Sequence, residues 1–450
     1  MRIAMVGTGY VGLVSGTCFA EFGHTVRCID KDEDKVKSLS AGYIPIYEPG
    51  LDELVTKNIE GGRLSFTTSL EKGISDADAI FIAVGTPSRR GQGHADLSFV
   101  FAALDEIAPL LRKETIICLK STVPVGTARQ VKAHISKLAP SVTVHVVSNP
   151  EFLREGSAIE DFMRPNRIIT GCQSEEAKQV MQEIYRPLFL NDTPILDTTW
   201  ESAEMIKYAS NAFLATKIAF INEVADMAET CGANVQDIAK GMGMDQRIGK
   251  HFLHAGPGFG GSCFPKDTRA LVHTATDLGV KLNIVESVMS SNEDRKLQMA
   301  DRIIHRLGGD VNGKTIAVLG VTFKPNTDDI RESPSLDIIP ALQAQGAAIQ
   351  AYDPQGMTEA ADCLTKVDWK GDSYSAAEGA DALVILTEWN EFRALDLERL
   401  KAALGYPLVI DLRNIYRPTE MQAAGFDYFS IGREPVHAAS AIEFPQKYGT

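Results

Sequence analysis

The stretch from residue 256 to residue 267 holds the side chains best suited to covalent chemistry. It reads Gly256-Pro257-Gly258-Phe259-Gly260-Gly261-Ser262-Cys263-Phe264-Pro265-Lys266-Asp267. Four glycines in six residues let the backbone wrap closely around a ligand. Pro265 suits the first position of a helix, which places Cys263 just before a helix N-terminus, where the helix dipole and a nearby lysine favour the thiolate. Asp267 follows about one helical turn later. We therefore expect Cys263 to be a nucleophile, whereas a lone cysteine is ordinarily a small buried hydrophobe.

Three other segments carry polar side chains suited to assist such a nucleophile. Lys207 and Asn211 are four residues apart and share a helix face, although a polar pair of this kind is ordinarily a solvated surface. The segments 121–127 (STVPVGT) and 149–156 (NPEFLREG) each follow a strand-like stretch. Ligands bind at the carboxyl ends of strands in doubly wound sheets, so we expect Thr122 and Glu151 to face a ligand. The alternative is two ordinary strand-ending turns.

The N-terminus carries a dinucleotide-binding pattern. Gly7-Thr8-Gly9-Tyr10-Val11-Gly12 follows a strand-like stretch and precedes a helical stretch expected to begin near Val14. The glycines allow backbone to approach a pyrophosphate at the helix N-terminus. Asp30 ends the next strand, where its carboxylate suits ribose hydroxyls and repels a 2′-phosphate, so NAD is favoured over NADP. Lys35 is expected to add a ribose or phosphate contact. FAD shares the fingerprint, but nothing else in the chain suggests a flavin.

These segments must be positioned by two α/β units. Short, apolar stretches rich in β-branched residues alternate with helical patterns, which favours parallel sheets with crossover helices. The strands expected in the first unit are 3–6, 25–30, 79–84, 115–119 and 143–147, and those in the second are 315–319, 348–352, 382–386 and 408–412. We therefore predict an α/β protein with two Rossmann-like doubly wound domains joined by a long central helix.

The central helix is expected from about Ser202 to Cys231. Thr198-x-x-Glu201 is a plausible capping box, and Gly232 a plausible stop. A helix of thirty residues reaches about 45 Å, which suits a bridge between domains or subunits. The domain boundaries that follow are 1–198 for an NAD-binding domain, 199–305 for a central helical domain with the cysteine loop, and 306–450 for a substrate-binding domain. Residues 432–450 are weakly patterned and are expected to form a loose tail.

Composition limits the classes of partner. Lys and Arg number 45 against 59 Asp and Glu, a formal charge of 45 − 59 = −14, which argues against nucleic-acid binding. No apolar run is long enough to span a bilayer, and the N-terminus leads directly into the glycine-rich turn, with no room for a signal peptide. The 7 cysteines are scattered without CxxC spacing, which indicates reduced thiols in the cytoplasm, with neither a disulfide frame nor a metal site.

Five segments in this order resemble the UDP-glucose/GDP-mannose dehydrogenase family over roughly residues 1–430. They are Gly7-x-Gly9-x-x-Gly12, Ser121-Thr122-Val123-Pro124, Asn149-Pro150-Glu151-Phe152-Leu153, Lys207-x-x-x-Asn211 and the loop from Gly258 to Asp267. The resemblance implies NAD as cofactor, a homodimer (with higher oligomers possible) supported by the central helix, and four-electron oxidation of UDP-glucose to UDP-glucuronate by two NAD⁺. Ser262 and Phe264 around Cys263 look like the UDP-glucose branch, because members acting on UDP-N-acetylmannosamine tend to carry His before the cysteine and an aliphatic residue after it.

The resemblance also implies roles for individual residues. The catalytic set is Cys263, Lys207, Asp267, Asn211, Glu151 and Thr122. The cofactor set is Gly7, Gly9, Tyr10, Val11, Gly12, Asp30, Lys35, Thr86, Thr122, Glu155, Cys263, Lys266 and Arg331. The substrate set is Glu151, Phe152, Leu153, Arg154, Glu155, Lys207, Asn211, Arg247, Phe252, Phe259, Gly260, Phe323, Lys324 and Arg413, with Arg247 reaching the substrate from the partner subunit. Surface charge is the ordinary alternative for Lys324, Arg331 and Arg413.

Other functions remain open at this point. A single-step dehydrogenase of the 6-phosphogluconate or hydroxyacid type would need no cysteine and release one NADH per substrate. A non-catalytic NAD-binding regulator would lack part of the polar set. Within the family, GDP-mannose, UDP-N-acetylmannosamine and UDP-galactose are alternative substrates. His254 and Arg154 depart from residues common in relatives, which bears on sugar or base preference.

Overall fold

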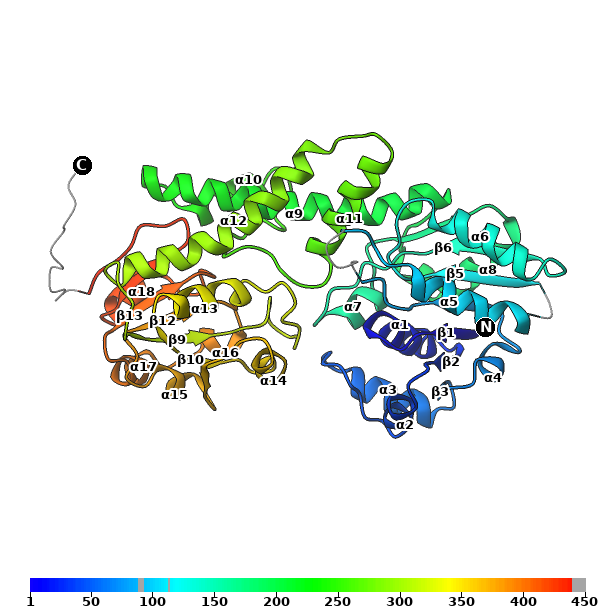
Figure 1. The fold of residues 1–450 in the computed structure, drawn as a ribbon, viewed down its shortest axis with the longest axis horizontal. Coiled ribbons are helices and arrows are strands. Elements are labelled where there is room, and N and C mark those ends of the chain that lie inside the picture. The colour runs from blue at the N-terminus through cyan, green and yellow to red at the C-terminus, as the bar shows by residue number, and fades with distance from the viewer. Residues whose placement is uncertain (88–92, 112–113, 439–450) are drawn as a thin grey trace. The chain divides into compact units, whose positions relative to one another are not determined.

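A computed structural model describes residues 1–87, 93–111 and 114–438 of the chain (Figure 1). The chain forms two compact units. Unit 1 comprises Met1–Ser210 and Arg269–Lys281, and unit 2 comprises Asn211–Thr268 and Leu282–Thr450. Helices α9 (Trp200–Cys231) and α11 (Phe264–Asp277) each contribute residues to both units. The cysteine loop therefore belongs to unit 2, and the dinucleotide motif to unit 1.

Unit 1 contains an eight-stranded sheet in the order β3-β2-β1-β4-β5-β6-β7-β8. Its strands are β1 (Arg2–Val6), β2 (Thr25–Ile29), β3 (Leu64–Thr67), β4 (Ala79–Ile82), β5 (Thr115–Leu119), β6 (Val144–Ser148), β7 (Ile168–Cys172) and β8 (Ile195–Thr198). All neighbours run parallel except the β6–β7 pair. The first six strands show the order 3-2-1-4-5-6 of dinucleotide-binding domains, which confirms the predicted fold class for this unit.

The helices of unit 1 lie between these strands. They are α1 (Tyr10–Glu21), α2 (Glu33–Ser40), α3 (Leu51–Glu60), α4 (Leu70–Ile74), α5 (Ser98–Ile107), α6 (Thr127–Leu138), α7 (Ala158–Met163) and α8 (Glu175–Tyr185), with 3₁₀ turns at Ala108–Leu110 and Arg186–Asn191. Helix α1 begins at Tyr10, with Gly9 as N-cap, so the predicted start near Val14 is wrong. The first helical turn runs through the glycine motif itself, and the free N–H groups of the helix therefore lie at Gly9 and the residues after it.

Unit 2 contains a six-stranded parallel sheet in the order β11-β10-β9-β12-β13-β14, again 3-2-1-4-5-6. Its strands are β9 (Thr315–Leu319), β10 (Ala348–Tyr352), β11 (Val367–Trp369), β12 (Ala382–Ile385), β13 (Leu408–Asp411) and β14 (Asp427–Ser430). Its other helices are α10 (Val235–Gly243), α12 (Asn283–Arg306), α13 (Ser335–Ala344), α14 (Met357–Ala361), α15 (Ser373–Ala377), α16 (Asn390–Arg393), α17 (Leu397–Ala403) and α18 (Pro418–Ala423). The second Rossmann-like domain is thereby confirmed.

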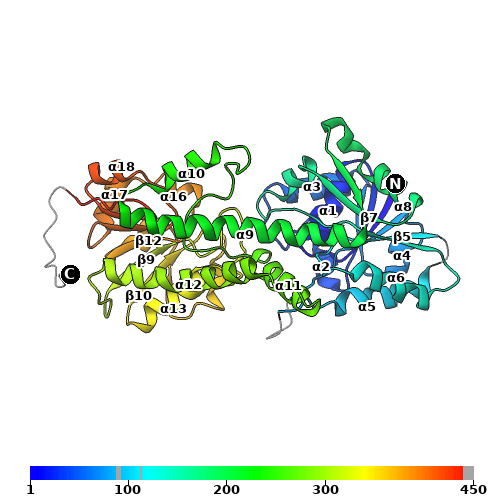
Figure 2. The same cartoon turned by 90° about the horizontal axis from the view of Figure 1, so that it is seen from above.

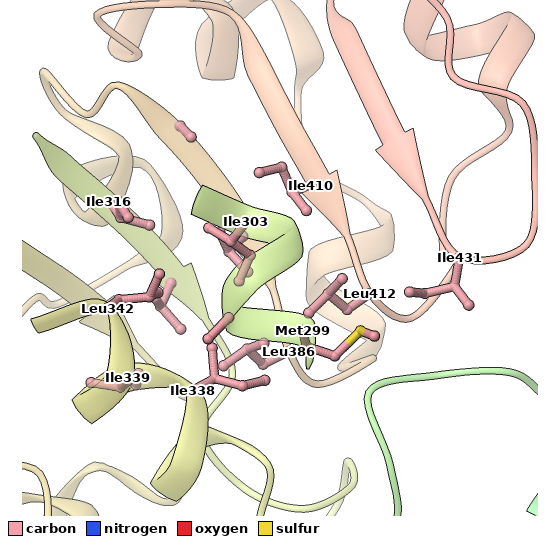
Figure 3. Packing of buried hydrophobic residues seen from close by; sticks show 14 of the residues in the cluster. Met299, Ile303, Ile316, Ile338, Ile339, Leu342, Leu386, Ile410, Leu412 and Ile431 are labelled. Carbon is pink, nitrogen blue, oxygen red and sulfur yellow. The ribbon is translucent and has the colours of Figure 1, made fainter. Parts of the chain in front are cut away.

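One core of unit 2 joins α12 and α13 to its sheet (Figure 3). Met299 and Ile303 on α12 meet Ile338 and Leu342 on α13, and all four side chains are buried. On the sheet side, Figure 3 shows Ile316, Leu386, Ile410 and Leu412 in the same cluster. Strands buried on both faces need continuous apolar runs, which is the pattern that identified these strands in the sequence.

The central helix is one continuous α-helix, drawn as the long green ribbon in Figure 2. It begins at Trp200, two residues before the predicted start. The predicted capping box is wrong, because Thr199 Oγ1 accepts the N–H of Ser202 and Glu201 pairs with Arg129 instead. The predicted stop is confirmed: Gly232 has a φ of +72°, and the N–H of Ala233 donates to Ala228 O at 2.9 Å. This is the reversed last turn that glycine permits.

Sequence patterns missed the strands at and near the sheet edges. Strands β3, β7, β8, β11 and β14 were not predicted, and most of them are short or mix polar with apolar residues. Part of the expected loose tail is also ordered, since Val436 and Tyr428 exchange backbone hydrogen bonds of 2.9 and 3.1 Å. Residues 439–450 lie outside the described residues. Within the described ranges, no helix is both long and apolar enough to cross a membrane.

The two sheets differ at the acidic residue that ends the second strand of each. In unit 2 this residue is Asp353, whose carboxylate is fully buried. One oxygen accepts the N–H groups of Val321 and Thr322, the Thr322 hydroxyl and the Trp389 indole; the other accepts the N–H groups of Gln355 and Gly356. Six donors saturate the carboxylate, so Asp353 holds its own loops together and keeps no lone pair free for a ribose.

We expect Asp353→Asn to destabilise unit 2 by about 3 kcal/mol, because an amide nitrogen cannot accept hydrogen bonds and would leave buried donors unpaired. Urea unfolding followed by tryptophan fluorescence checks this, since Trp369 and Trp389 lie in unit 2. The matched control is Asp368→Asn, at an exposed carboxylate paired with Lys370, and its unfolding midpoint should stay near that of the wild type. Equal midpoints for both variants would contradict the assigned role.

Candidate active site

The glycine motif of unit 1 forms a tight turn from β1 into α1. Gly7 has a φ of +98°, and a Cβ there would lie 2.7 Å from Ala83 O. A Cβ at Gly12 would lie 2.0 Å from Gly7 O, so neither position accepts a side chain. At Gly9 an added Cβ meets no described atom within 4 Å. The α1 N-terminus thus opens onto free space beside unpaired backbone N–H groups, which fits the pyrophosphate of a dinucleotide.

Asp30 lies beside this turn, as predicted. Its carboxylate accepts the N–H of Thr8 at 3.0 Å and the Thr8 hydroxyl, and Lys35 Nζ lies 3.3 Å away. Burial by itself disfavours the charge, but the hydrogen bonds from Thr8 and the charge of Lys35 outweigh it and hold the pKa of Asp30 below its usual value. Asp30 is therefore an anion, which suits ribose hydroxyls and repels a 2′-phosphate. Lys35, predicted as a cofactor contact, is paired with it.

Two further predicted residues meet at the carboxyl edge of the same sheet. The Thr86 hydroxyl, after β4, donates to the carbonyl of Thr122, after β5, at 2.9 Å. The loop that carries Thr122 continues into α6, whose first N–H groups, at Gly126 and Ala128, donate to the carboxylate of Glu204 at 2.6 and 2.7 Å. Burial raises the pKa of Glu204 to about 7. Glu204, on α9, was not predicted, because a glutamate in a helix carries no sequence signal of a capping role.

Glu151 and Lys207 form a buried ion pair in unit 1. Lys207 Nζ donates to Glu151 Oε1 at 3.1 Å, and Glu151 Oε2 accepts the N–H of Leu153 at 2.6 Å. Both side chains are almost fully buried. Burial favours the neutral carboxyl, yet the charge of Lys207 and the hydrogen bond from Leu153 outweigh it, so the pKa of Glu151 lies below its usual value. The pair therefore presents a carboxylate and an ammonium at the carboxyl end of β6.

Phe152, which directly follows Glu151, stacks against Arg167, a residue that was not predicted. The guanidinium of Arg167 lies 3.7 Å from the ring centroid, and Lys207 Nζ lies 5.3 Å from it. Arg167 immediately precedes β7, whose antiparallel pairing with β6 brings the two segments to one edge. The stack holds the aromatic ring beside the ion pair.

Tyr10 joins the glycine motif to the segment after Glu151. Its hydroxyl donates to Glu48, whose carboxylate also accepts the N–H groups of Gly156 and Ala158 at 2.6 and 2.8 Å. Burial and Glu48 raise the pKa of Tyr10, and the charge of the neighbouring Glu155 adds to this. Glu48 thus brings together the predicted residues Tyr10 and Glu155. Glu48 itself lies in no recognised sequence motif.

The cysteine loop ends at the N-terminus of α11, as predicted. Cys263 is the residue before the helix, and its carbonyl accepts the N–H of Asp267 at 2.8 Å. Pro265 is the second helical residue and not the first, because Phe264 already belongs to the helix. The Cys263 side chain is partly exposed, and the Ser262 hydroxyl lies 3.5 Å from its sulfur. A partly exposed thiol at a helix N-terminus has the environment of a reactive cysteine.

Asp267 connects α11 to α9 within unit 2. One of its carboxylate oxygens accepts Asn211 Nδ2 at 2.6 Å, and the other accepts Lys266 Nζ at 2.6 Å. The Asp267 side chain is only 1% exposed. The side-chain amide of Asn211 has a second N–H that this contact does not use, so it can still donate to a ligand. Three predicted residues, the buried Asn211 and Asp267 and the partly exposed Lys266, therefore form one polar cluster about one helical turn from Cys263.

Helix α12 holds the glycine-rich loop in place. Asn292 brackets Phe259, accepting its N–H at 2.8 Å and donating to its carbonyl at 3.0 Å. Arg295 Nε donates to Gly256 O at 2.7 Å, and Asn222 accepts the N–H of Gly256 at 2.8 Å. These buried anchors were not predicted, since polar residues within helices usually face solvent. They give a glycine-rich segment one conformation.

The predicted substrate residues of unit 2 gather around the same loop. Phe323 follows β9, and its ring packs so closely on Gly261 that an added Cβ would lie 2.7 Å away. Arg413 follows β13 and donates to the Leu386 and Phe323 carbonyls at 2.6 and 3.0 Å. Lys324 Nζ lies 5.3 Å from the Phe323 ring centroid. Close packing on the loop also excludes a side chain at Gly260, where a Cβ would lie 2.3 Å from Glu332 O. On the helix side, the Phe264 ring lies 6.0 Å from those of Phe252 and Phe259.

All four predicted arginines pair with acids in this conformation. Arg413 Nε lies 3.2 Å from Glu388 Oε2, and the other three pair with acids close to them in the sequence. Arg154 binds Asp161 through both carboxylate oxygens, and Arg331 binds Asp329 in the same way. Arg331 still contacts the cysteine loop, because its carbonyl accepts the N–H of Gly261 at 2.7 Å. Arg247 pairs with Asp245, two residues earlier, and its side chain is 90% exposed. Arg154 and Arg247 are therefore surface ion pairs in this conformation.

The comparisons with known proteins agree with this geometry. The UDP-glucose/GDP-mannose dehydrogenase family matches in three parts, with its NAD binding domain at residues 1–189, its central domain at 201–294 and its UDP binding domain at 317–418. The UDP-glucose 6-dehydrogenase of Rhizobium meliloti (strain 1021) is 57% identical, covering 96% of this chain and 100% of the relative. UDP-glucose 6-dehydrogenase TuaD of Bacillus subtilis (strain 168) is 49% identical, covering 97% and 94%.

A solved structure extends the likeness to the fold. The UDP-glucose dehydrogenase from the hyperthermophilic archaeon Pyrobaculum islandicum has a TM-score of 0.87 and 38% identity, covering 93% of this chain and 95% of that one. Because these relatives align with nearly the whole chain, the alignments include the motifs of both units. The chain belongs to the UDP-glucose/GDP-mannose dehydrogenase family.

Proposed function

We propose that the protein oxidises UDP-glucose to UDP-glucuronate with NAD as cofactor. One UDP-glucose, two NAD⁺ and one water give UDP-glucuronate, two NADH and protons. The observation that carries the proposal is Cys263 at the N-terminus of α11, beside the buried Asn211–Asp267 pair. The relatives at 57% and 49% identity, both UDP-glucose 6-dehydrogenases, support the sugar. Phe264 after the cysteine is the residue typical of that branch.

NAD⁺, held at the glycine turn and at Asp30, supplies the hydride acceptor in each oxidation. We further assign Lys35, Thr86, Glu155, Lys266 and Arg331 to cofactor contacts. In the first oxidation the C6 hydroxyl must lose its proton while C6 loses a hydride. We assign this proton to a water held by Thr122, Lys207 and Asp267. The product of the step is an aldehyde at C6.

Cys263 acts in the second oxidation. Its thiolate adds to the aldehyde carbon, a C–S bond forms, and the carbonyl electrons move to oxygen as an alkoxide. Lys207 and the spare amide N–H of Asn211 are assigned to stabilise this oxyanion, for which one donor is typically worth about 10²–10³ in rate. The alkoxide then expels hydride, and the C=O bond reforms as a thioester. Because the aldehyde is held covalently, it need not leave the protein.

Hydrolysis of the thioester completes the reaction. Water adds to the thioester carbon, its proton passes to a carboxylate, and the Cys263 thiolate leaves as the C–S bond breaks. We assign Glu151 and Asp267 to these proton transfers. Glu151 is suited to accept a proton because Lys207 keeps it ionised despite burial. Asp267 is buried and hydrogen-bonded on both oxygens, which fixes its orientation.

The nucleotide sugar is assigned to the UDP-binding domain and to the segments around Cys263. Phe323, Lys324 and Arg413 lie at or near the carboxyl edge of the unit 2 sheet, where doubly wound domains bind ligands. Lys324 and Arg413 bring positive charge, which suits a diphosphate. Phe259, Gly260 and Phe252 shape the wall of the sugar site in this assignment, and Phe152, Leu153, Arg154 and Glu155 are assigned to the same substrate. We propose the division into domains as residues 1–198 for NAD binding, 199–305 for the central helical domain with the cysteine loop, and 306–450 for binding of the nucleotide sugar.

We propose that two copies of the chain associate through α9. Phe213, Phe220 and Met227 lie seven residues apart on this helix and are 65%, 50% and 70% exposed. A seven-residue spacing places one apolar stripe along a helix and suits pairing with a second helix. A second copy offers the same stripe, so the contact is self-complementary. Arg247, exposed on unit 2, is assigned to reach the substrate of the partner. Location in the cytoplasm likewise stays a prediction.

We expect two NADH for each UDP-glucose consumed by the purified protein with excess NAD⁺. Absorbance of NADH, with the sugar quantified by chromatography, gives the ratio. GDP-mannose, UDP-N-acetylmannosamine and UDP-galactose, assayed alongside, should show a much lower kcat/KM. A ratio of one would indicate a single-step dehydrogenase, and a higher kcat/KM with another sugar would replace UDP-glucose as the substrate.

Cys263→Ala is expected to lower steady-state turnover by at least 10³-fold, because without the thiolate the aldehyde has no nucleophile. Cys263→Ser should form an ester that hydrolyses slowly, visible by mass spectrometry of the intact chain as an adduct with the mass of the substrate acyl group. Cys231→Ala, at an exposed cysteine at the end of α9, is the matched control and should turn over normally. Normal turnover by Cys263→Ala would refute the covalent mechanism.

Phe220→Asp is expected to convert the dimer into monomers, because two carboxylates would meet at the centre of the apolar stripe. Light scattering after size-exclusion chromatography measures the mass. Phe99→Asp makes the same change at an exposed phenylalanine on α5 and should leave the mass unchanged. A Phe220→Asp protein that keeps the wild-type dimer mass would exclude α9 as the interface.

A further inference from the structure

Lys120 is a buried cation whose hydrogen-bond partners are both neutral. It directly follows β5 in unit 1 and is 4% exposed. Its Nζ lies 3.1 Å from Asn149 Oδ1 and 3.1 Å from Tyr185 Oη, between rings of Phe162 and Tyr185 whose centroids are 5.7 and 5.8 Å away. These groups orient the ammonium without neutralising it. Burying a charge in this way lowers the stability of the fold, so its presence calls for a function.

Glu151 follows Asn149, a hydrogen-bond partner of Lys120, by two residues. The Glu151 and Lys120 side chains interact through their charges, and Glu151 also forms the 3.1 Å ion pair with Lys207. The charge of one carboxylate therefore interacts with two ammonium groups, a net charge of +2 − 1 = +1. Cys118 on β5 and Tyr185 on α8 are the other titratable groups near Lys120, and burial raises the pKa of both, so they stay neutral.

The two cations differ in what else they must do. Lys207 is assigned to the oxyanion of the substrate, and during that step its charge is shared with the oxyanion. A buried carboxyl that loses its counter-charge tends to take up a proton, and a protonated Glu151 cannot accept one from water. Lys120 is tied to Asn149 and Tyr185, and Asn149 is itself tied to Ile169 O at 2.8 Å. It therefore stays in place while Lys207 acts.

We infer that Lys120 is a positioning residue of the active site, whose fixed ammonium keeps Glu151 ionised and orients the Asn149–Glu151 turn. The inference rests on the proposed function, in which Glu151 exchanges protons with the reacting water. Lys120 contacts neither substrate nor cofactor in this role and acts only through Glu151 and Asn149. Its loss should therefore lower kcat and move the pH profile while leaving KM nearly unchanged.

The stability of the protein should show the cost of this charge. Burial lowers the pKa of Lys120 to about 8. Below pH 8 the lysine is charged in both the folded and the unfolded chain, and the folded state bears the full cost of burial. Above pH 8 the folded state loses the proton first, so the cost is relieved as pH rises toward the ordinary pKa of lysine. A neutral residue of similar length should stabilise the fold below pH 8, by an amount that shrinks above it.

The test measures kcat and KM against pH, from pH 5 to 9, for Lys120→Met and for a second uncharged variant, Lys120→Gln. At low pH kcat should fall as Glu151 takes up a proton, and we call this part of the pH profile the acid limb. In both variants we expect the acid limb to shift to higher pH by about one unit, the lower end of the effect of a neighbouring opposite charge. Lys120→Met should also melt at a higher temperature than the wild type at pH 6 to 7, a readout independent of activity.

Three controls separate the charge from the surrounding contacts. Lys132→Met makes the same substitution at a partly buried lysine bonded to Val144 O and should leave the acid limb unchanged. Tyr185→Phe removes a hydroxyl that meets Lys120 and Asn149 but keeps the charge, so its acid limb should also stay in place. Glu151→Gln removes the titrating group and should abolish the acid limb.

Three results would overturn the inference, and the first two distinguish its failure from that of the proposed function. If Glu151→Gln abolishes the acid limb while both Lys120 variants keep the wild-type limb, the proposed function stands and the role of Lys120 is refuted. If Glu151→Gln keeps the wild-type limb, Glu151 is not the titrating base, and its part in the proposed function fails along with the inference. A lower melting temperature of Lys120→Met at pH 6 to 7 would show that Lys120 stabilises the fold, and would equally refute the inference.

Discussion

Parallel strands end at the same edge of a sheet, and this constraint places the polar groups that follow the strands of both units. In unit 1 the glycine turn, Thr86, Thr122 and Glu151 follow four neighbouring strands, β1, β4, β5 and β6. In unit 2 Phe323 and Arg413 follow β9 and β13 in the same way. Residues far apart in the chain thus meet without any long-range signal in the sequence. The first six strands of the unit 1 sheet and the six strands of the unit 2 sheet share one order, so the same rule applies twice.

Gathering polar groups at a buried edge requires each one to find a partner. Hydrogen bonds between the neighbouring segments at the sheet edge provide these partners. Thr86 binds the carbonyl of Thr122, Asn149 binds Ile169 O, and Asp353 accepts six donors in unit 2. The same partners fix the loops in one conformation, because each hydrogen bond that satisfies a buried group also removes a degree of freedom. The same hydrogen bonds therefore satisfy the buried polar groups and hold the loops of the site in place.

Buried charge is the second consequence of bringing polar groups together. Glu151 and Lys207 neutralise each other, and Asp267 is held between Asn211 and Lys266. Such pairs contribute little net stability, because the loss of hydration offsets much of their attraction. The charge of Lys207 does hold the pKa of Glu151 below its usual value, which suits the proton transfer of the proposed reaction. Each acid has a lysine ammonium on one oxygen and a neutral N–H donor on the other, from Leu153 for Glu151 and from Asn211 for Asp267.

The sequence by itself determined the features that depend on local chemistry. Gly7 and Gly12 had to be glycine at a tight turn, the β-branched runs had to be buried strands, and the residues around Cys263 had to end in a helix. Their physical causes act within a few residues, so the pattern shows them. The short edge strands β3 and β11 were missed, because pairing at a sheet edge depends on a neighbour that local composition does not contain. The start of α9 was misplaced for a similar reason, since Thr199 and not Thr198 provides the cap.

Only the tertiary structure decided which partners the predicted residues have. Lys35 pairs with Asp30, Arg154 with Asp161, and Arg331 with Asp329, and the sequence pattern indicated none of these pairings. Glu48, Lys120, Glu204, Arg167 and Asn292 act through contacts 15 to 110 residues away in the chain, and no sequence motif indicates these contacts. Hydrogen bonds and charge interactions fall off within a few ångströms, so their partners exist only once the chain has brought distant segments together.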